Sequence, residues 1–181
     1  MKFILFFLPF WFVIAGLAAT VAQGQAPASP PQDEMARELR RELVLLPSDT
    51  VFDNVLADVR GNTAILSGEV IHPSLRTEAE NAAKRVHGIA SVDDQIEVIP
   101  PSPMDDRVRD EVFGAIYEYA GLRKYEFAVR KPIRIIVQDG RVSLYGVVDS
   151  DADRNLAGVR ARSIPDHVPV TNNLLVAEPR S

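Results

Sequence analysis

The chain has 181 residues, with 20 Lys and Arg against 25 Asp and Glu, 46% hydrophobic residues and no cysteine. This composition predicts one or two ordinary globular domains and excludes collagen-like and wholly disordered chains. The lack of cysteine excludes thiolate metal sites, thiol nucleophiles, disulfides and a lipidated N-terminal cysteine. A net charge of −5 is not typical of nucleic-acid-binding proteins, so no nucleic acid partner is expected.

The N-terminal segment, residues 1–22, has the composition of a secretory signal peptide. Lys2 precedes an uncharged apolar run, and small residues suitable for cleavage lie near Ala22. We therefore expect the rest of the chain to lie outside the cytoplasm. An uncleaved N-terminal helical anchor is the alternative, because the run approaches the ~20 residues that span a bilayer. Residues 23–32 are rich in proline, alanine and glutamine and are expected to form a flexible tether.

The rest of the chain contains the same unit twice. At a constant offset of 78 residues the two copies align, so that Gly68 falls on Gly146 and Arg76 on Arg154. This register holds from Val55 over Ile133 to Val98 over Val176, and the first helix aligns better at an offset of 77. A register kept over this length indicates a duplicated domain. The first domain is expected at residues 33–99.

The first copy begins with a helix, because apolar residues recur at helical spacing from Met35 to Leu43. Two strands follow, around residues 55–59 and 64–70, where hydrophobic residues alternate with polar ones. A second helix starts at Pro73, a residue favoured in the first helical position. A last strand closes the copy.

A short proline-stiffened linker, residues 100–103, leads into the second domain, residues 104–178. Ser102 is placed to cap its first helix, and Ser150 to cap its second. Between them an Asp-Gly pair that ends at Gly140 predicts a tight hairpin turn.

The predicted fold class is α+β, with two tandem αββαβ modules. Each module is expected to be a small three-stranded mixed sheet with two helices on one face. Since about 70 residues is close to the lower size limit for a stable core, mutual packing of the two copies is also expected.

The sequence pattern resembles the BON domain, named for bacterial osmotically induced and nodulation proteins. The segment GRVSLYGVV, from Gly140 to Val148, carries the most specific match, and NTAILSGEV, from Asn62 to Val70, carries a weaker one. The closing strand of the first copy departs from the family pattern at Asp94, where asparagine is usual.

The resemblance implies an αββαβ module of exported bacterial envelope proteins. Such modules usually have no catalytic activity and are thought to associate with phospholipid membranes or other envelope components. A role in envelope stress or integrity, including osmotic stress, would fit this resemblance.

Reactive groups are not arranged for catalysis or metal binding. The histidines, His72, His87 and His167, lack the spacing of metal ligands. An acidic run ending at Asp153 resembles a calcium loop, but Arg154 occupies the position that requires glycine. No nucleophile elbow, phosphate loop or dinucleotide fingerprint occurs. We expect no enzyme activity, no catalytic residue, no metal, no cofactor and no small-molecule substrate.

Four residues are expected to have structural roles. Gly68 and Gly146 end the second strand of each copy, where a side chain would meet the crossing helix or force a twist. Arg76 and Arg154 lie in the first turn of the second helix, an unfavourable place for a cation. Each is therefore expected to contact a carboxylate or carbonyl across its domain.

The two copies differ in charge. Residues 27–103 contain 7 basic and 13 acidic residues, whereas residues 104–181 contain 12 of each. A cationic band follows the first helix of the second copy, and it consists of Arg123, Lys124, Arg130, Lys131 and Arg134. Such a band is typical of a surface that attracts anionic lipid headgroups.

Helix geometry predicts an aromatic surface beside this band. If Val112 and Tyr119 face the sheet, then Phe113 and Tyr117 point away from it. We therefore predict weak docking on an anionic phospholipid membrane surface through Phe113, Tyr117, Arg123, Lys124 and Tyr125. Packing of the same aromatic stripe against the first copy is the alternative interpretation.

Two other kinds of partner remain open. An envelope protein, recognised by one copy or by a sheet edge, is the main alternative to lipid. A carbohydrate or peptidoglycan ligand is less favoured, because few aromatic residues cluster for sugar stacking. The sequence favours no particular oligomeric state.

Overall fold

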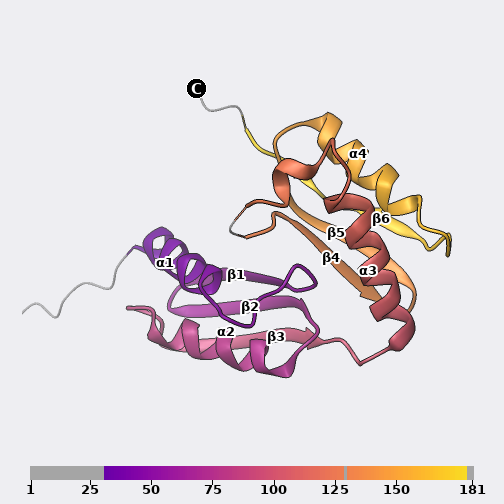
Figure 1. Ribbon diagram of the computed structural model, residues 1–181. Helices are drawn as coiled ribbons and strands as arrows, with labels where there is room; N and C mark the ends of the chain where they lie inside the picture. The colour runs from indigo at the N-terminus through magenta and orange to yellow at the C-terminus, as the bar shows by residue number, and fades with distance from the viewer. Residues whose placement is uncertain (1–30, 129, 179–181) are drawn as a thin grey trace, which may run out of the picture.

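We describe the protein from a computed structural model that covers residues 31–128 and 130–178. The predicted signal peptide, residues 1–22, and nearly all of the predicted tether lie outside these ranges. Within them the chain folds into two α+β units, each with a mixed sheet and two helices (Figure 1). The predicted fold class and the duplication are therefore confirmed.

The first unit contains, in order, α1 (Gln32–Val44), β1 (Asn54–Arg60), β2 (Thr63–Val70), α2 (Pro73–Arg85) and β3 (Ser91–Val98). Strands β1 and β2 form an antiparallel hairpin, and β3 pairs parallel to β2 in the order β1-β2-β3. Helix α1 buries Met35, Leu39 and Leu43, which join a core with the inner residues of the sheet and α2. The helical spacing of these residues thus produces the packing expected from the sequence.

The second unit contains α3 (Pro103–Tyr117), the 3-10 turn η1 (Arg123–Tyr125), β4 (Ile133–Gln138), β5 (Arg141–Val148), α4 (Asp151–Arg162), β6 (Val170–Asn172) and β7 (Leu175–Val176). Strand β4 is antiparallel to β5, whereas β6 and β7 both pair parallel to β5. The closing strand is therefore interrupted, and at the break the Asn172 side chain accepts a hydrogen bond from the Leu174 amide (3.2 Å).

Local signals in the sequence fix the ends of these elements. The Ser102 hydroxyl accepts a hydrogen bond from the Asp105 amide (3.3 Å), and Ser150 accepts one from the Asp153 amide (3.1 Å), so both predicted N-caps are present. At the β4–β5 turn, Gly140 has a positive φ of 71°, as a tight hairpin requires.

Gly68 and Gly146 occupy matching positions with φ of 109° and 117°. A Cβ atom would overlap the carbonyl oxygen of Asn54 in the first case and that of Pro132 in the second. We expected a side chain at these positions to meet the crossing helix or to force a twist, and the structure shows that the backbone of the adjacent chain segment is what excludes it. This close approach explains why glycine is needed at both positions.

Among the described residues, no helix combines the length and the apolar content required to span a bilayer. The apolar run predicted as a signal or anchor lies outside the described ranges.

Candidate functional site at the junction between the two units

The loop between α1 and β1, residues 45–53, contacts the second unit and is here called the junction segment. Val51 and Phe52 pack against the core of the second unit, and the ring of Phe52 meets that of Phe113 edge-on at 6.2 Å between centroids. The Ile135 amide donates a hydrogen bond to the Val51 carbonyl (2.9 Å), which supplies a partner at the edge of β4. The junction segment therefore fastens the two units together.

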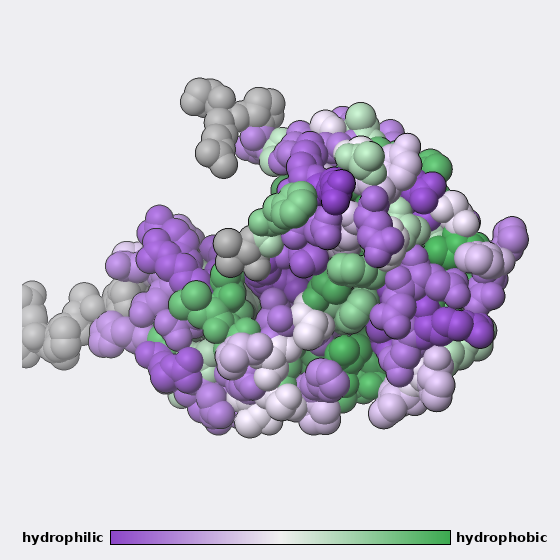
Figure 2. Space-filling model, viewed as in Figure 1, coloured by the Kyte–Doolittle hydropathy of each residue, from purple (hydrophilic) through white to green (hydrophobic). Residues whose placement is uncertain are grey.

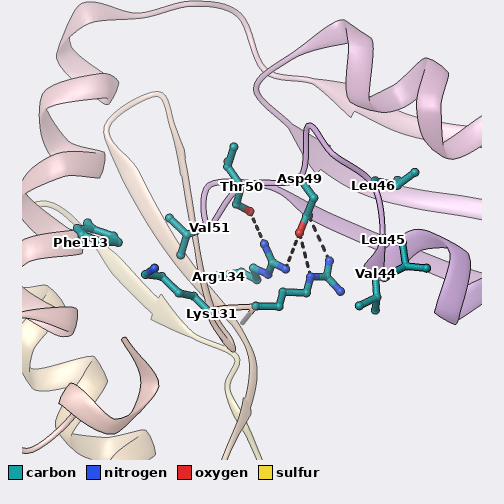
Figure 3. Close-up of a pocket in the computed structure, with 10 residues that line it drawn as sticks. Val44, Leu45, Leu46, Asp49, Thr50, Val51, Phe113, Lys131 and Arg134 are labelled. Atoms are coloured by element: carbon teal, nitrogen blue, oxygen red, sulfur yellow. Dashed lines mark hydrogen bonds and ion pairs between the residues drawn. The ribbon is translucent and has the colours of Figure 1, made fainter. Parts of the chain in front are cut away.

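A buried carboxylate strengthens this contact. Asp49 accepts hydrogen bonds from Arg130 (2.9 and 3.2 Å) and from Arg134 (2.9 Å), and Arg134 also donates to the Thr50 carbonyl (Figure 3). The side chains of Asp49 and Arg134 are only 7% and 8% exposed. Two cations of the predicted band thus stabilise the contact between the units instead of facing solvent.

A cavity of about 410 Å³ opens beside this carboxylate (Figure 3). Its lining combines aliphatic, acidic and basic side chains, namely Val44, Leu45, Leu46, Asp49, Thr50, Val51, Phe113, Arg130, Lys131 and Arg134. Lys131 lies 6.0 Å from the ring of Phe113 and 5.9 Å from that of Tyr117. No ion pair involves Lys131 within the part of the chain that the structure describes, so its charge is available at the cavity.

Exposed apolar residues border the cavity. Leu45, at the end of α1, is 75% exposed, and Val44 beside it is half exposed. Figure 2 shows apolar side chains gathered where the end of α1 approaches the second unit, within a largely polar surface. Contiguous exposed apolar groups of this kind mark interaction surfaces.

Phe127 is an exposed aromatic residue on the chain segment that leads to Arg130 and Lys131, and no sequence-based prediction names it. The side chain is 75% exposed, and three positions separate it from Arg130, so their Cα atoms lie within about 11 Å. Phe127 lies on no helix or strand, so a search for helical periodicity does not find it. The basic residues that flank Phe127 in the segment RKYEFAVRK are the sequence signal that could have identified it.

We define the junction patch as three exposed apolar residues and two cations: Val44, Leu45, Phe127, Arg123 and Lys131. Val44, Leu45 and Lys131 line the cavity, and Phe127 and Arg123 precede Lys131 on the same chain segment. The Arg123 side chain is largely exposed, and its one ion pair within the described residues is a long contact of 3.7 Å with Glu126. The patch draws on both units, because Val44 of α1 and Leu45 of the junction segment belong to the first and the chain between α3 and β4 supplies the rest.

Tyr117 was wrongly predicted to point outward. Its side chain is fully buried, and its hydroxyl donates to the Ile133 carbonyl (2.7 Å) and accepts from the Ile133 amide (3.0 Å). Burial raises the pKa of the Tyr117 hydroxyl. Tyr119, predicted to face the sheet, is exposed because α3 ends at Tyr117 and the helical rotation does not continue. The chain entering β4 covers the flank of α3 that we expected to face solvent.

Tyr125 and Lys124 also belong to the internal structure. The Tyr125 side chain is buried, and its hydroxyl donates to Asp153 (3.0 Å) and accepts from the Asp149 amide (2.8 Å). Lys124 pairs with Asp149 and Asp153, each at 2.9 Å, and these hydrogen bonds raise the pKa of its ammonium group. Both residues anchor the η1 turn to the start of α4. The prediction of an exposed Tyr125 is therefore wrong, whereas the Lys124 side chain stays exposed and its contact with lipid stays a prediction.

The carboxylate of Asp153 is the centre of this anchor. Burial alone would raise its pKa, but hydrogen bonds from Lys124, Ser150 and Tyr125 outweigh burial and lower the pKa below its usual value. The Asp153 carboxylate is therefore charged and fully engaged inside the second unit.

The position of Phe113 agrees in part with each of the two interpretations made from the sequence. Its ring is partly buried against Phe52 of the first unit, as the packing alternative expects, yet it also lines the junction cavity. Of the five predicted lipid-binding residues, Phe113 lines the junction cavity, and Arg123 and Lys124 keep exposed side chains. Tyr117 and Tyr125 are buried in the second unit and serve its internal packing.

The two arginines assigned structural roles behave differently. Arg76 reaches β3 and pairs with Asp94 at 2.8 Å, a contact that raises the pKa of the guanidinium. Arg154 pairs with Asp151 in its own helix (2.7 Å), so its expected contact across the domain is not present. Asn172 stands at the position equivalent to Asp94 and carries no charge to attract Arg154.

Within residues 31–128 and 130–178, no group of three or more His, Asp or Glu side chains is arranged to hold a metal ion.

Comparison with known proteins identifies the repeated unit. The family described as BON domain matches residues 33–100 and 119–178. The second match begins after α3, although α3 packs in the same core as β4, β5 and α4. No curated protein matches the chain.

Two similar solved structures are of CdsD, described as a structural protein of the type III secretion system of Chlamydia trachomatis. One is 10% identical and covers 80% of this chain and 92% of its own, with a TM-score of 0.31. The other, a C-terminal domain, is 12% identical and covers 82% of this chain and 100% of its own, with a TM-score of 0.31.

Proposed function

Since this chain belongs to the BON domain family, whose domains are binding modules rather than catalytic ones, we propose that it is an exported envelope protein that docks weakly on anionic phospholipid. The docking surface is the junction patch. The signal-like segment at residues 1–22 supports export to the periplasm, with an uncleaved anchor as the alternative. A role in envelope stress or integrity is part of this proposal.

The observation that carries the proposal is the exposed ring of Phe127 between basic residues. Aromatic rings favour the headgroup level of a bilayer, and arginine and lysine favour anionic headgroups. Leu45 presents a second exposed apolar side chain at the cavity that Lys131 also lines. A surface that combines apolar tips with available cations suits shallow insertion into an anionic interface.

The charge distribution makes this docking oriented and weak. The first unit, within residues 27–103, carries an excess of acidic residues, whereas residues 104–181 are balanced. An anionic membrane therefore repels most of the first unit more strongly than it repels the second, which favours an orientation with the junction patch towards the lipid. Because part of the attraction is screened Coulombic interaction, added salt should weaken it.

Vesicle flotation of the mature protein tests the proposal. We expect the protein to float with vesicles that contain phosphatidylglycerol and not with pure phosphatidylcholine. The double variant Phe127→Ser with Lys131→Glu should bind at least about thirtyfold more weakly, because each unit of charge near the surface contributes roughly 1 kcal/mol. Met104→Ser is the matched control, since Met104 is an exposed apolar residue at the start of α3 and outside the junction patch.

Equal flotation of the double variant and the control would overturn the assignment of the surface. Capture of a protein from envelope extract without any dependence on lipid would instead favour the alternative function, a protein-interaction module.

A further inference from the structure

The two repeats can be compared at the face of their second helix, where charges differ between them. In the first unit this face contains two complete ion pairs. Arg76 pairs with Asp94 of β3 at 2.8 Å, and Lys84 pairs with Glu80 one turn earlier at 2.7 Å. Each cation of this face therefore has a carboxylate within contact distance.

The second unit keeps the cations of this face and lacks both carboxylates. At the same offset of 78 residues, Arg154 and Arg162 replace the two cations, but Gly158 replaces Glu80 and Asn172 replaces Asp94. The Asn172 amide donates to the backbone carbonyl of Arg154 (2.8 Å) and does not neutralise its guanidinium. The second unit thus keeps both cations without the two carboxylates found in the first, and Arg154 pairs instead with Asp151 of its own helix.

The absence of a side chain at Gly158 lets two neighbouring side chains approach α4 closely at this site. A Cβ atom there would lie 2.7 Å from the Asn172 amide nitrogen and 3.3 Å from a guanidinium nitrogen of Arg162. The Arg162 guanidinium therefore lies over Gly158, one helical turn back towards Arg154. Any side chain at position 158 would displace the groups that line this surface.

A cavity of about 530 Å³ lies at this place, between α4 and the closing strand. Its lining consists of Arg154, Asn155, Val159, Arg162, Asn172 and Leu174 and contains no carboxylate. Within the described part of the chain Arg162 has no ion pair, and Arg154 contacts only the exposed Asp151. We call this cavity the α4 groove.

We propose that the α4 groove binds a phosphate group, carried either by a free phosphate ester or by a lipid headgroup. Guanidinium groups present several donors in a planar fork that fits phosphate oxygens. Val159, which is 59% exposed, and Leu174 supply an apolar wall for the organic part of such a ligand. This site is separate from the junction patch, and it stands whether or not that patch binds membranes.

The affinity should be modest, with a dissociation constant on the order of millimolar, because ion pairs of exposed side chains are weak. Lipid on a vesicle would present many phosphate groups at once, so the same contacts would then act with a higher effective concentration.

The test is an NMR titration of the exported protein with glycerol 3-phosphate at constant ionic strength. We expect saturable shifts of the amides in α4 around residues 155–162, and a loss of affinity of at least tenfold in Arg162→Gln. Asn172→Asp, which restores the carboxylate found in the first unit, should cause a similar loss because it pairs with Arg154. Lys84→Gln is the matched control in the first unit and should leave binding unchanged.

A parallel titration with vesicles containing phosphatidic acid separates the two sources. Shifts with glycerol 3-phosphate alone assign a free phosphate ester, and shifts that saturate far earlier with vesicles assign a lipid headgroup. The proposal is overturned if α4 amides do not respond to either probe, or if Arg162→Gln and Lys84→Gln bind equally. Phe127→Ser should not alter the response of α4, so failure of this site is distinct from failure of the junction patch.

Discussion

Gly146 lies at a position where a close backbone contact allows only glycine. The carbonyl of Pro132 lies where a Cβ would be, and φ is 117°. We predict that Gly146→Ala lowers the free energy of unfolding by about 3 kcal/mol, since a strained φ and an overpacked contact each cost about 1–2 kcal/mol. Gly140→Ala is the control, because Gly140 also has positive φ but open space around it, and only about 1 kcal/mol should be lost. Urea unfolding midpoints measure both, and equal losses would contradict the steric argument.

Asp153 makes stability depend on pH in the acid range. Its pKa in the folded protein is lower than the usual 3.8, so its stabilising contribution is present above 3.8 and is lost as pH falls through the folded pKa. We predict that the free energy of unfolding falls more steeply below pH 3.8 in the wild type than in Asp153→Asn. Denaturant unfolding at several pH values between 2 and 5 tests this. Parallel pH profiles for the two proteins would show that the carboxylate is not engaged as described.

At the scale of residues, the role of a polar side chain can be predicted from the sequence only when its hydrogen-bond partner is close along the chain. Ser102 and Ser150 act within three positions along the chain, so their caps could be recognised from the sequence. The hydroxyl of Tyr117 is satisfied by Ile133, and that of Tyr125 by Asp153. A hydrogen bond to a residue 16 or 28 positions away turns an aromatic side chain inward without leaving a periodic pattern.

At the scale of elements, the junction segment joins a loop of one unit to a strand of the other. We predict that Asp49→Asn leaves both folds intact but loosens this contact, because the nearly buried Arg134 loses its carboxylate partner. Breaking such a pair costs about 3–5 kcal/mol. Hydrogen exchange at the Ile135 amide, which donates to Val51, should accelerate strongly in the variant.

Asp58→Asn is the control for this experiment, because Asp58 pairs with Arg60 on the exposed surface at 3.7 Å. An Ile135 amide that exchanges at the same rate in both variants would show that Asp49 does not hold the units together.

The helices and strands were predictable because their apolar residues recur with the right period. The junction segment was not, since residues 45–53 have no periodicity and their partners are on the second unit. The closing strand of the second unit was predicted as continuous, and the side-chain turn at Asn172 interrupts it. The exposed part of the candidate site therefore lies mainly on segments that carry no repeating pattern.

At the scale of the whole molecule, duplication supplies two similar frameworks that have diverged in charge. The first unit retains Asp94 and Glu80 as partners for Arg76 and Lys84, whereas in the second unit Lys131 at the junction and Arg162 on α4 form no ion pair within the described residues. The hydrogen bonds of Asp49 that join the two units link residues 81 and 85 positions apart. One unit alone would lack the junction patch, because the patch draws residues from both.

The most direct test of membrane docking is the environment of a fluorescent label at position 127. The chain has no cysteine, so Phe127→Cys and Met104→Cys each allow one environment-sensitive dye to be attached. On addition of phosphatidylglycerol vesicles, we predict a blue shift and increased emission for the label at 127 and no change for the label at 104. A label at 127 that stays in water while the protein binds the vesicles would contradict docking through the junction patch.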